Sequence, residues 1–157
     1  MHAAEWKVWQ HAISFLEGEG EIFDGLISLP PTSPLRSFVD VEKCIDEFEK
    51  GGVDVVITST VSNKSPYFNM VVADENGYCN LVNPGKKIYR RQDSPLIYDM
   101  TTVAYVARPL FVNKYNGLFE GKIKQVQIPI ERAVDIDNQL DFDFVEFLYL
   151  KKNNEKY

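Results

Sequence analysis

The sequence predicts an α/β fold: an open, mostly parallel sheet with flanking helices, into which a β-hairpin is inserted. Two runs typical of buried strands, Gly25 to Leu29 and Val53 to Thr58, enclose an amphipathic helical stripe. Farther along, an Asn-Gly pair at Asn76 and Gly77 interrupts this alternation with a tight turn. The 157 residues are 45% hydrophobic and 25% charged, which indicates one globular domain over residues 1–157.

The amino-terminal segment has the apolar spacing of one helical face. Trp6, Trp9, Ile13 and Leu16 recur at helical intervals, and Gly18 is expected to end the helix. Two tryptophans so close to the first residue carry a large apolar area. We expect further chain upstream to pack on them, and a sticky surface where it is lacking.

The first strand and the helix after it are separated by a proline-rich loop. Pro30-Pro31 closes the strand, because prolines cannot continue a central ladder. Ser37 and Asp40 have capping-box spacing, and the stripe from Phe38 to Phe48 predicts a helix that ends at Gly51-Gly52.

The second strand gives this region a β-α-β order, which is typical of parallel strands joined by a right-handed crossover. In open sheets of this class, ligands bind beyond the carboxyl ends of the strands. The loop from Pro30 to Arg36 lies at one such end. It is therefore a candidate binding loop.

The region of about residues 64–99 departs from the α/β pattern. Asn69 to Ala73 and Tyr78 to Val82 flank a turn that favours positive φ, which predicts a hairpin. Such an insertion, rich in exposed aromatics, either caps the core or forms a dimerisation arm.

The rest of the chain continues with alternating elements. We expect a buried strand at Thr101 to Val106, a short helix from Pro109, a strand at Ile123 to Ile128 and a helix from about Gln139 to Tyr149. Between the last two, the extended run Ala133 to Asp137 places Asp135 and Asp137 on one side of the backbone.

Charge and composition exclude several classes of function. A net charge of −6 argues against nucleic-acid binding, and no apolar run is long enough to span a bilayer or to act as a signal peptide. Cys44 and Cys79 form neither a disulfide framework nor a metal cluster. We expect a cytoplasmic protein with no membrane partner.

Two segments have side chains that suit a reaction on phosphates. Asp135 and Asp137 resemble the one or two carboxylates that hold Mg²⁺, although such pairs are also common on solvated turns. The loop Pro31 to Arg36 presents hydroxyls and a guanidinium, which suits an anion or a purely structural connection. The basic run Lys86 to Arg91 fits a solvated edge. No histidine or cysteine has the neighbours of a catalytic nucleophile or base.

Three ordered motifs resemble those of the acylneuraminate cytidylyltransferases. They are Leu29-Pro-Pro-Thr-Ser-Pro-Leu-Arg36, Tyr89-Arg-Arg-Gln-Asp-Ser-Pro95 and Ala133-Val-Asp-Ile-Asp137. The resemblance runs from about Trp6 to Leu150 and implies a nucleotide-diphospho-sugar transferase-like fold. It also implies transfer of CMP from CTP to a nine-carbon acidic sugar, legionaminic or N-acetylneuraminic acid, with release of pyrophosphate and with Mg²⁺ as cofactor.

The resemblance assigns roles to residues at matching positions. It implies that Asp135 and Asp137 bind the metal and act in catalysis together with Arg36, and that the inserted hairpin joins a homodimer. The substrate-binding positions that it implies are Thr32, Ser33, Arg91, Gln92, Tyr105, Leu118 and Phe119.

The chain also departs from the family pattern. The amino-terminal Gly-Ser-Lys loop that binds the nucleotide in similar enzymes has no counterpart here, so we expect an N-terminally truncated chain that is inactive alone. Pro30 and Thr101-Thr102 replace residues near the sugar in the family, and Tyr67 to Met70 is more similar to the legionaminate branch. Two alternatives stay open: a non-catalytic α/β binding or dimerisation module, and nucleotide transfer to a neutral sugar phosphate.

Overall fold

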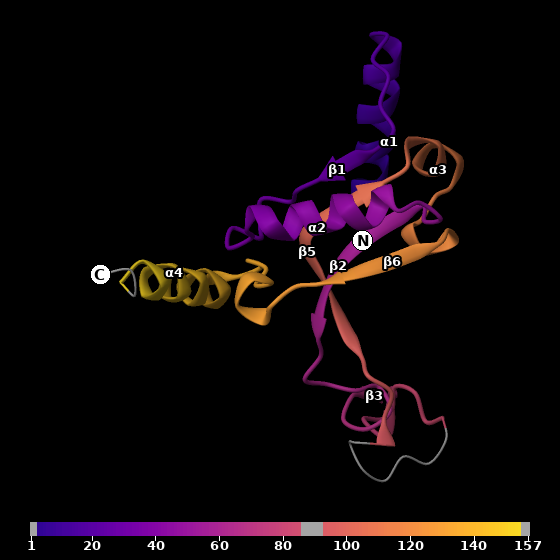
Figure 1. Cartoon of the computed structure of the whole chain (residues 1–157). Helices are drawn as coiled ribbons and strands as arrows, with labels where there is room; N and C mark the ends of the chain where they lie inside the picture. The colour runs from indigo at the N-terminus through magenta and orange to yellow at the C-terminus, as the bar shows by residue number, and fades with distance from the viewer. Residues whose placement is uncertain (1–2, 86–92, 155–157) are drawn as a thin grey trace. The chain divides into compact units, whose positions relative to one another are not determined.

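The computed structural model describes residues 3–85 and 93–154, which form two compact units (Figure 1). The first unit comprises Met1–Ser59 and Met100–Tyr157, and the second comprises Thr60–Asp99. The second unit covers nearly the same residues as the insertion expected at about 64–99.

A four-stranded mixed sheet forms the centre of the first unit. Its strand order is β1 (Leu26–Ser28), β5 (Tyr98–Ala107), β2 (Val55–Val61) and β6 (Ile123–Gln127). β1 runs antiparallel to β5, with Ser28 beside Tyr105, whereas β6 runs parallel to β2. The α/β class is confirmed, and β5 separates the two strands of the β-α-β unit.

The first helix, α1 (Ala3–Gly18), packs its aromatic face into the core of the same unit. Trp6 and Trp9 are only 2% and 4% exposed, and the ring centroids of Trp9 and Tyr105 lie 5.5 Å apart. The Trp6 indole N–H donates to the carbonyl of Tyr115 at 2.8 Å. The expectation that the tryptophans need further chain to cover them is wrong, because β5 and the α3 region cover them.

Helix α2 (Phe38–Glu49) forms as its capping signals predict. The capping box between Ser37 and Asp40 is present, and Cys44 and Phe48 are buried against the sheet. The Arg108 guanidinium lies 4.8 Å from the centre of the Phe48 ring and donates from Nε to the carbonyl of Val53 at 2.7 Å. The carboxyl end of α2 is therefore attached to the strands.

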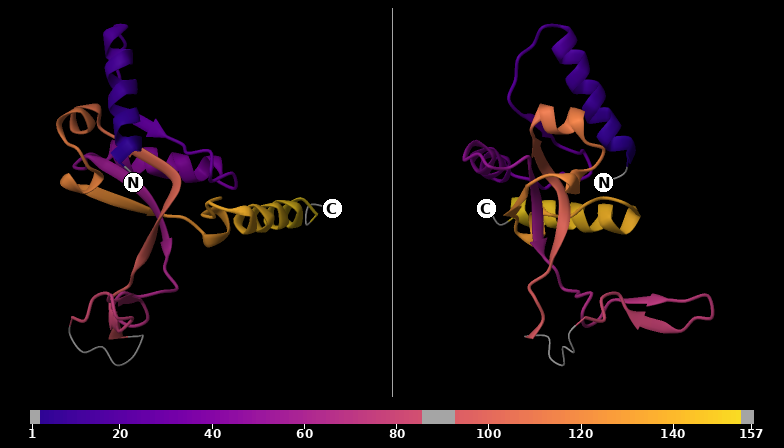
Figure 2. Two further views of the ribbon diagram at one scale, coloured as in Figure 1. Left: turned by 180° about the vertical axis from the view of Figure 1, so that it is seen from behind. Right: turned by 90° about the vertical axis from the view of Figure 1, so that its right-hand side faces the viewer.

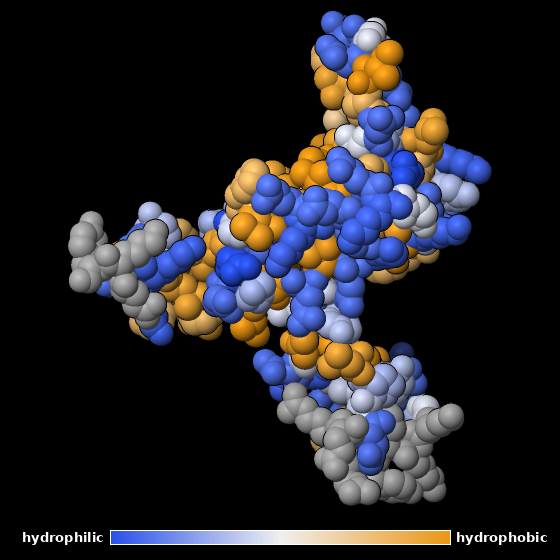
Figure 3. All heavy atoms as spheres, viewed as in Figure 1, coloured by the Kyte–Doolittle hydropathy of each residue, from blue (hydrophilic) through white to orange (hydrophobic). Residues whose placement is uncertain are grey.

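The remaining elements of this unit are short, except for the last helix. They are α3 (Pro109–Lys114), η2 (Leu118–Glu120), η3 (Ile130–Arg132) and α4 (Gln139–Asn154). On α4 only Val145 is buried, and six larger apolar residues are exposed, which Figure 3 shows as orange atoms along this helix. Among the described residues, no helix has the length and apolarity that crossing a bilayer would require.

The second unit contains the expected hairpin. β3 (Val71–Ala73) and β4 (Cys79–Leu81) pair antiparallel, as the right-hand view of Figure 2 shows. Gly77 has a φ of 84°, and the Asp74 carboxylate accepts hydrogen bonds from two backbone N–H groups of the turn. All three residues of β3 are exposed, which leaves this short ribbon with apolar side chains in contact with water.

Candidate functional site

The loop after β1 turns the side chain of one predicted site residue, Ser33, into the protein. Ser33 has no exposed surface, and its hydroxyl lies 2.6 Å from the hydroxyl of Thr102 on β5. Thr32 is half-buried, and its carbonyl accepts a hydrogen bond from the Ile136 N–H at 2.9 Å. Ser33 thus holds the loop against the sheet, while a direct contact with a substrate stays a prediction.

Arg36 binds the backbone of its own loop. Its Nε donates to the carbonyl of Ser33 at 2.8 Å, and its Nη2 donates to the carbonyl of Pro30. Burial lowers the pKa of the guanidinium from its ordinary value. Arg36 therefore fixes the turn between β1 and α2, and its predicted catalytic role stays a prediction.

The segment with the two predicted metal ligands is held beside this loop. Asp135 follows η3 on an irregular stretch without strand structure, and the hydrogen bond from the Ile136 N–H to the Thr32 carbonyl ties the stretch to the first motif. Asp137 is exposed, and its backbone N–H donates to the carboxylate of Asp141 at 3.0 Å, near the beginning of α4. The structure therefore brings the first and third motifs together.

The carboxylates of this segment fit a hard divalent cation bound partly by other ligands. The Oδ1 atom of Asp135 is buried and has no hydrogen-bond partner within the described part of the chain. A buried polar atom without a partner is costly, and a cation would satisfy it. No cluster of three or more His, Cys, Asp or Glu residues that could hold a metal occurs in residues 3–85 and 93–154. Mg²⁺ commonly takes one or two carboxylates with waters and substrate phosphates, so its binding by Asp135 and Asp137 stays a prediction.

Tyr105 lies in the core beneath the candidate site. It is 2% exposed, and burial, followed by the negative charges of Glu5 and Asp135, raises its pKa to about 12. The phenol therefore remains protonated at neutral pH and can donate a hydrogen bond. Its predicted contact with a sugar stays a prediction.

The remaining predicted substrate residues are not gathered beside Asp135. Leu118 is 4% exposed and belongs to the core cluster with Trp6 and Phe111, whereas Phe119 is 73% exposed. Both precede β6, and Asp135 follows it. The whole of the basic run at 86–91, together with the predicted site residues Arg91 and Gln92, lies outside the described residues.

Asp40 and Arg132 form an ion pair at the base of the site, and neither was predicted as a site residue. Arg132 donates from Nε and Nη2 to the two oxygens of Asp40, each at 2.8 Å. Burial alone raises the pKa of Asp40, but hydrogen bonds from Arg132 and Ser37 outweigh it and hold the pKa below its ordinary value. The bond to Asp40 raises the pKa of Arg132. Breaking such a pair costs about 3–5 kcal/mol when one buried charge is left alone.

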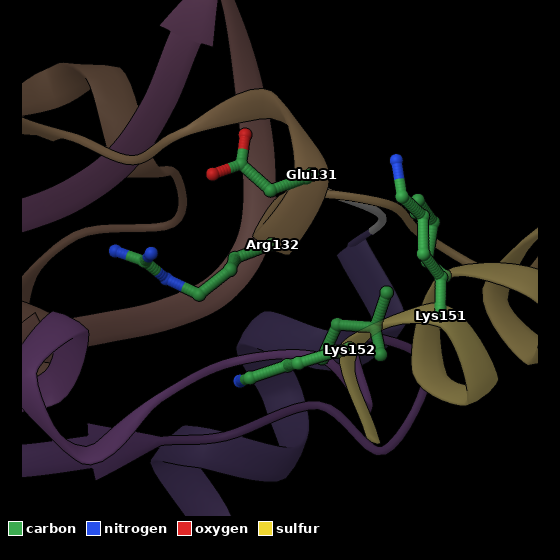
Figure 4. Close-up of a pocket in the computed structure, with 6 residues that line it drawn as sticks. Glu131, Arg132, Lys151 and Lys152 are labelled. Atoms are coloured by element: carbon green, nitrogen blue, oxygen red, sulfur yellow. The ribbon is translucent and has the colours of Figure 1, made fainter. Parts of the chain in front are cut away.

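A pocket of about 330 Å³ adjoins this pair. Figure 4 shows Glu131 and Arg132 projecting from one turn, and Lys151 and Lys152 from the end of α4. Its lining combines these four charged side chains with Leu35 and Leu148. In sequence, Asp40 could be found as the N3 residue of the α2 capping box, but no local pattern pairs it with Arg132.

Comparison with known proteins gives relatives over part of their length. The chain is 30% identical to the post-translational flagellin modification protein B of Campylobacter coli and to the CMP-N,N'-diacetyllegionaminic acid synthase of Campylobacter jejuni, in each case over 131 residues. These matches cover 83% of the chain and 55% of each relative. The N-acylneuraminate cytidylyltransferase of Streptococcus agalactiae is 24% identical over 74% of the chain and 28% of its own length. The chain thus spans about half the length of the Campylobacter relatives.

The fold has a solved counterpart. The crystal structure of 4-diphosphocytidyl-2C-methyl-D-erythritol synthase from Anaerococcus prevotii superposes with a TM-score of 0.56 at 16% identity, covering 88% of this chain and 65% of that one. A search against protein-family models gives no match. Over the region that it shares with its curated relatives, the chain is thus similar to a CMP-legionaminic acid synthase and to an N-acylneuraminate cytidylyltransferase.

Proposed function

We propose that this chain functions in a cytidylyltransferase. The enzyme transfers CMP from CTP to a nine-carbon acidic sugar, legionaminic or N-acetylneuraminic acid, and releases pyrophosphate. The buried Asp135 oxygen without a partner, held beside the loop after β1, is the observation that carries the proposal. The names of the relatives supply the substrate class, since one is a legionaminic acid synthase and another an N-acylneuraminate cytidylyltransferase.

In this proposal Asp135 and Asp137 hold Mg²⁺, which would balance the charge of the reacting phosphates when bound. Thr32 and its neighbours position the substrate next to the two carboxylates. Arg36 and Ser33 act by fixing the loop, through their bonds to loop carbonyls and to Thr102. Arg91, Gln92, Tyr105, Leu118 and Phe119 keep the sugar-side roles that the family resemblance implies.

The test measures pyrophosphate release from CTP, Mg²⁺ and N,N'-diacetyllegionaminic or N-acetylneuraminic acid. Because the chain spans about half the length of its Campylobacter relatives, the assay has two arms. One arm uses the 157-residue chain, and the other a fusion of this chain to the portion of the C. jejuni relative that it does not match. We expect release in the fusion and little or none from the chain alone.

The matched variants are Asp135→Asn and Asp137→Asn, with Asp143→Asn as the control on the exposed face of α4. The first two variants should lower the rate of pyrophosphate release by about 100-fold or more, because the negative charge on the reacting phosphates in the transition state would lose its stabilisation. The control should keep the wild-type rate. A folded fusion with no turnover of any nonulosonic acid contradicts the substrate assignment.

We propose that the hairpin unit joins two copies of the chain. An isolated two-stranded hairpin is marginal in water, and Val71, Val72 and Tyr78 are each more than half exposed. Analytical ultracentrifugation should show a dimer, and Val72→Lys should make it a monomer. A monomeric wild type over the micromolar range contradicts this assembly.

The second candidate is a non-catalytic binding or dimerisation module. It is favoured by the inward orientation of Ser33 and Arg36, whose polar atoms bind the chain itself. This candidate predicts sugar binding without turnover, in the fusion as well as in the chain. Calorimetric titration with the sugar, next to the rate assay, distinguishes the two candidates.

A further inference from the structure

The Asp40–Arg132 ion pair connects α2, which follows the first motif, to η3, which precedes the third motif. Asp40 is the third residue of α2, and Arg132 is the last residue of η3. Asp40 has no exposed surface and also accepts a hydrogen bond from the Ser37 N–H at 2.9 Å. Because both of its oxygens are engaged, the carboxylate is fixed in place.

Asp135 lies between two attachments to the segment from Thr32 to Asp40. On one side Arg132 binds Asp40 through two hydrogen bonds, and on the other side the Ile136 N–H donates to the carbonyl of Thr32. Only two residues separate Arg132 from Asp135. The backbone that carries the Asp135 carboxylate is therefore held at both of its ends.

Most polar atoms of the pair form hydrogen bonds within the protein. The oxygens of Asp40 are shared between Arg132 and the α2 amino terminus, and two nitrogens of the Arg132 guanidinium point to Asp40. The pair can therefore affect the site through the position of the segment that carries Asp135. Residues behind metal ligands commonly orient them, and their loss weakens binding of the metal by about 10–100-fold.

We propose that the Asp40–Arg132 ion pair is a positioning device that sets the place of the Asp135 carboxylate, and thereby the divalent-cation affinity of the Asp135–Asp137 segment. This inference rests on the proposed function, since it takes that segment as the metal site. It assigns a positioning role to two residues that the sequence did not predict as part of the site.

The same helix supplies a matched control. Glu47, near the other end of α2, accepts a hydrogen bond from Lys124 of β6 at 2.6 Å. This pair also joins α2 to the strand before η3, but it is not next to Asp135. Glu47→Gln removes the same charge as Asp40→Asn and leaves the attachment at the site intact.

The experiment uses the full 157-residue chain with Mn²⁺ alone as the probe, followed by the electron paramagnetic resonance signal of the free ion. Asp40→Asn and Arg132→Lys should weaken Mn²⁺ binding by about tenfold or more, and Glu47→Gln by less than about twofold. Arg132→Lys keeps a charge opposite Asp40 and loses the two-pronged geometry, so it serves if Asp40→Asn fails to fold. Circular dichroism identifies the folded variants.

Hydrogen exchange of the Ile136 amide gives a second readout that needs no metal. The two site variants should speed this exchange more than Glu47→Gln does, because the segment loses one of its two attachments. Folded site variants with wild-type Mn²⁺ affinity would overturn the proposal. If the Asp135→Asn variant binds Mn²⁺ as tightly as the wild type does, Asp135 is not a metal ligand and the metal assignment of the proposed function fails. In that case the exchange decides: faster exchange supports positioning of the segment, and unchanged exchange refutes it.

Discussion

The hydroxyl pair of Ser33 and Thr102 allows a quantitative test of how the loop after β1 is held. The oxygens lie 2.6 Å apart; Ser33 has no exposed surface, whereas Thr102 is half-buried. Thr102→Val leaves the Ser33 hydroxyl buried without its partner, which should cost about 1–3 kcal/mol. Ser33→Ala leaves Thr102 within reach of water, so its cost should stay near 1 kcal/mol.

The double variant Ser33→Ala/Thr102→Val removes both polar groups with little change of shape. Its cost should be smaller than the sum of the single costs by about 1 kcal/mol or more, because no hydroxyl is left without a partner. Urea unfolding at neutral pH, followed by circular dichroism, measures all four proteins. Additive costs would refute the reasoning. In the fusion assay, a double variant that recovers stability but not turnover would indicate that Ser33 contacts the substrate.

Three further predictions concern packing, thiol chemistry and pH. Gly121→Ala should destabilise the chain by about 1–3 kcal/mol, because its Cβ would clash with the ring of Phe111. The control Gly18→Ala meets no atom within 4 Å and should not lower the melting temperature. Cys44 is fully buried, and burial, followed by the nearby charge of Asp40, raises its pKa to about 12. A thiol reagent at about pH 8 should therefore modify only Cys79, and rapid reaction in a Cys79→Ser variant would contradict this. The pKa of Asp40 is lowered in the folded chain, so its stabilisation is present above an unfolded-state pKa of about 3.9 and is lost as the pH falls below it. Asp40→Asn should consequently flatten the acid limb of stability against pH, and an unchanged limb would count against the ion pair.

Local signals in the sequence predict the elements well. The Ser37 and Asp40 spacing identifies the start of α2, and the Asn-Gly pair identifies the hairpin turn, since each depends on a few adjacent residues. The order of strands in the sheet depends on pairing between distant residues. The placement of β5 between β1 and β2 therefore could not be predicted from periodicity.

The burial of Trp6 and Trp9 shows the same limitation. Their spacing predicts a helical face, which α1 has, but it does not say what covers that face. Tyr105 and Phe111, about a hundred residues away, cover it within this chain. Motif matching likewise predicts the residues of the loop after β1 but not the direction in which each side chain points.

The directions of these side chains leave few groups that can bind a ligand at the candidate site. Ser33 and Arg36 use their polar atoms to hold the loop, so from the first motif mainly Thr32 remains to face a ligand. In the third motif, Asp135 has a buried oxygen that no described residue satisfies, and Asp137 is exposed. A bound cation would satisfy the first carboxylate and could use the second as a solvent-side ligand. Replacing Asp135 should therefore abolish Mn²⁺ binding, while replacing Asp137 should weaken it to a smaller extent. Equal losses of Mn²⁺ affinity in both variants would show that the burial of a carboxylate does not determine how much it contributes to binding.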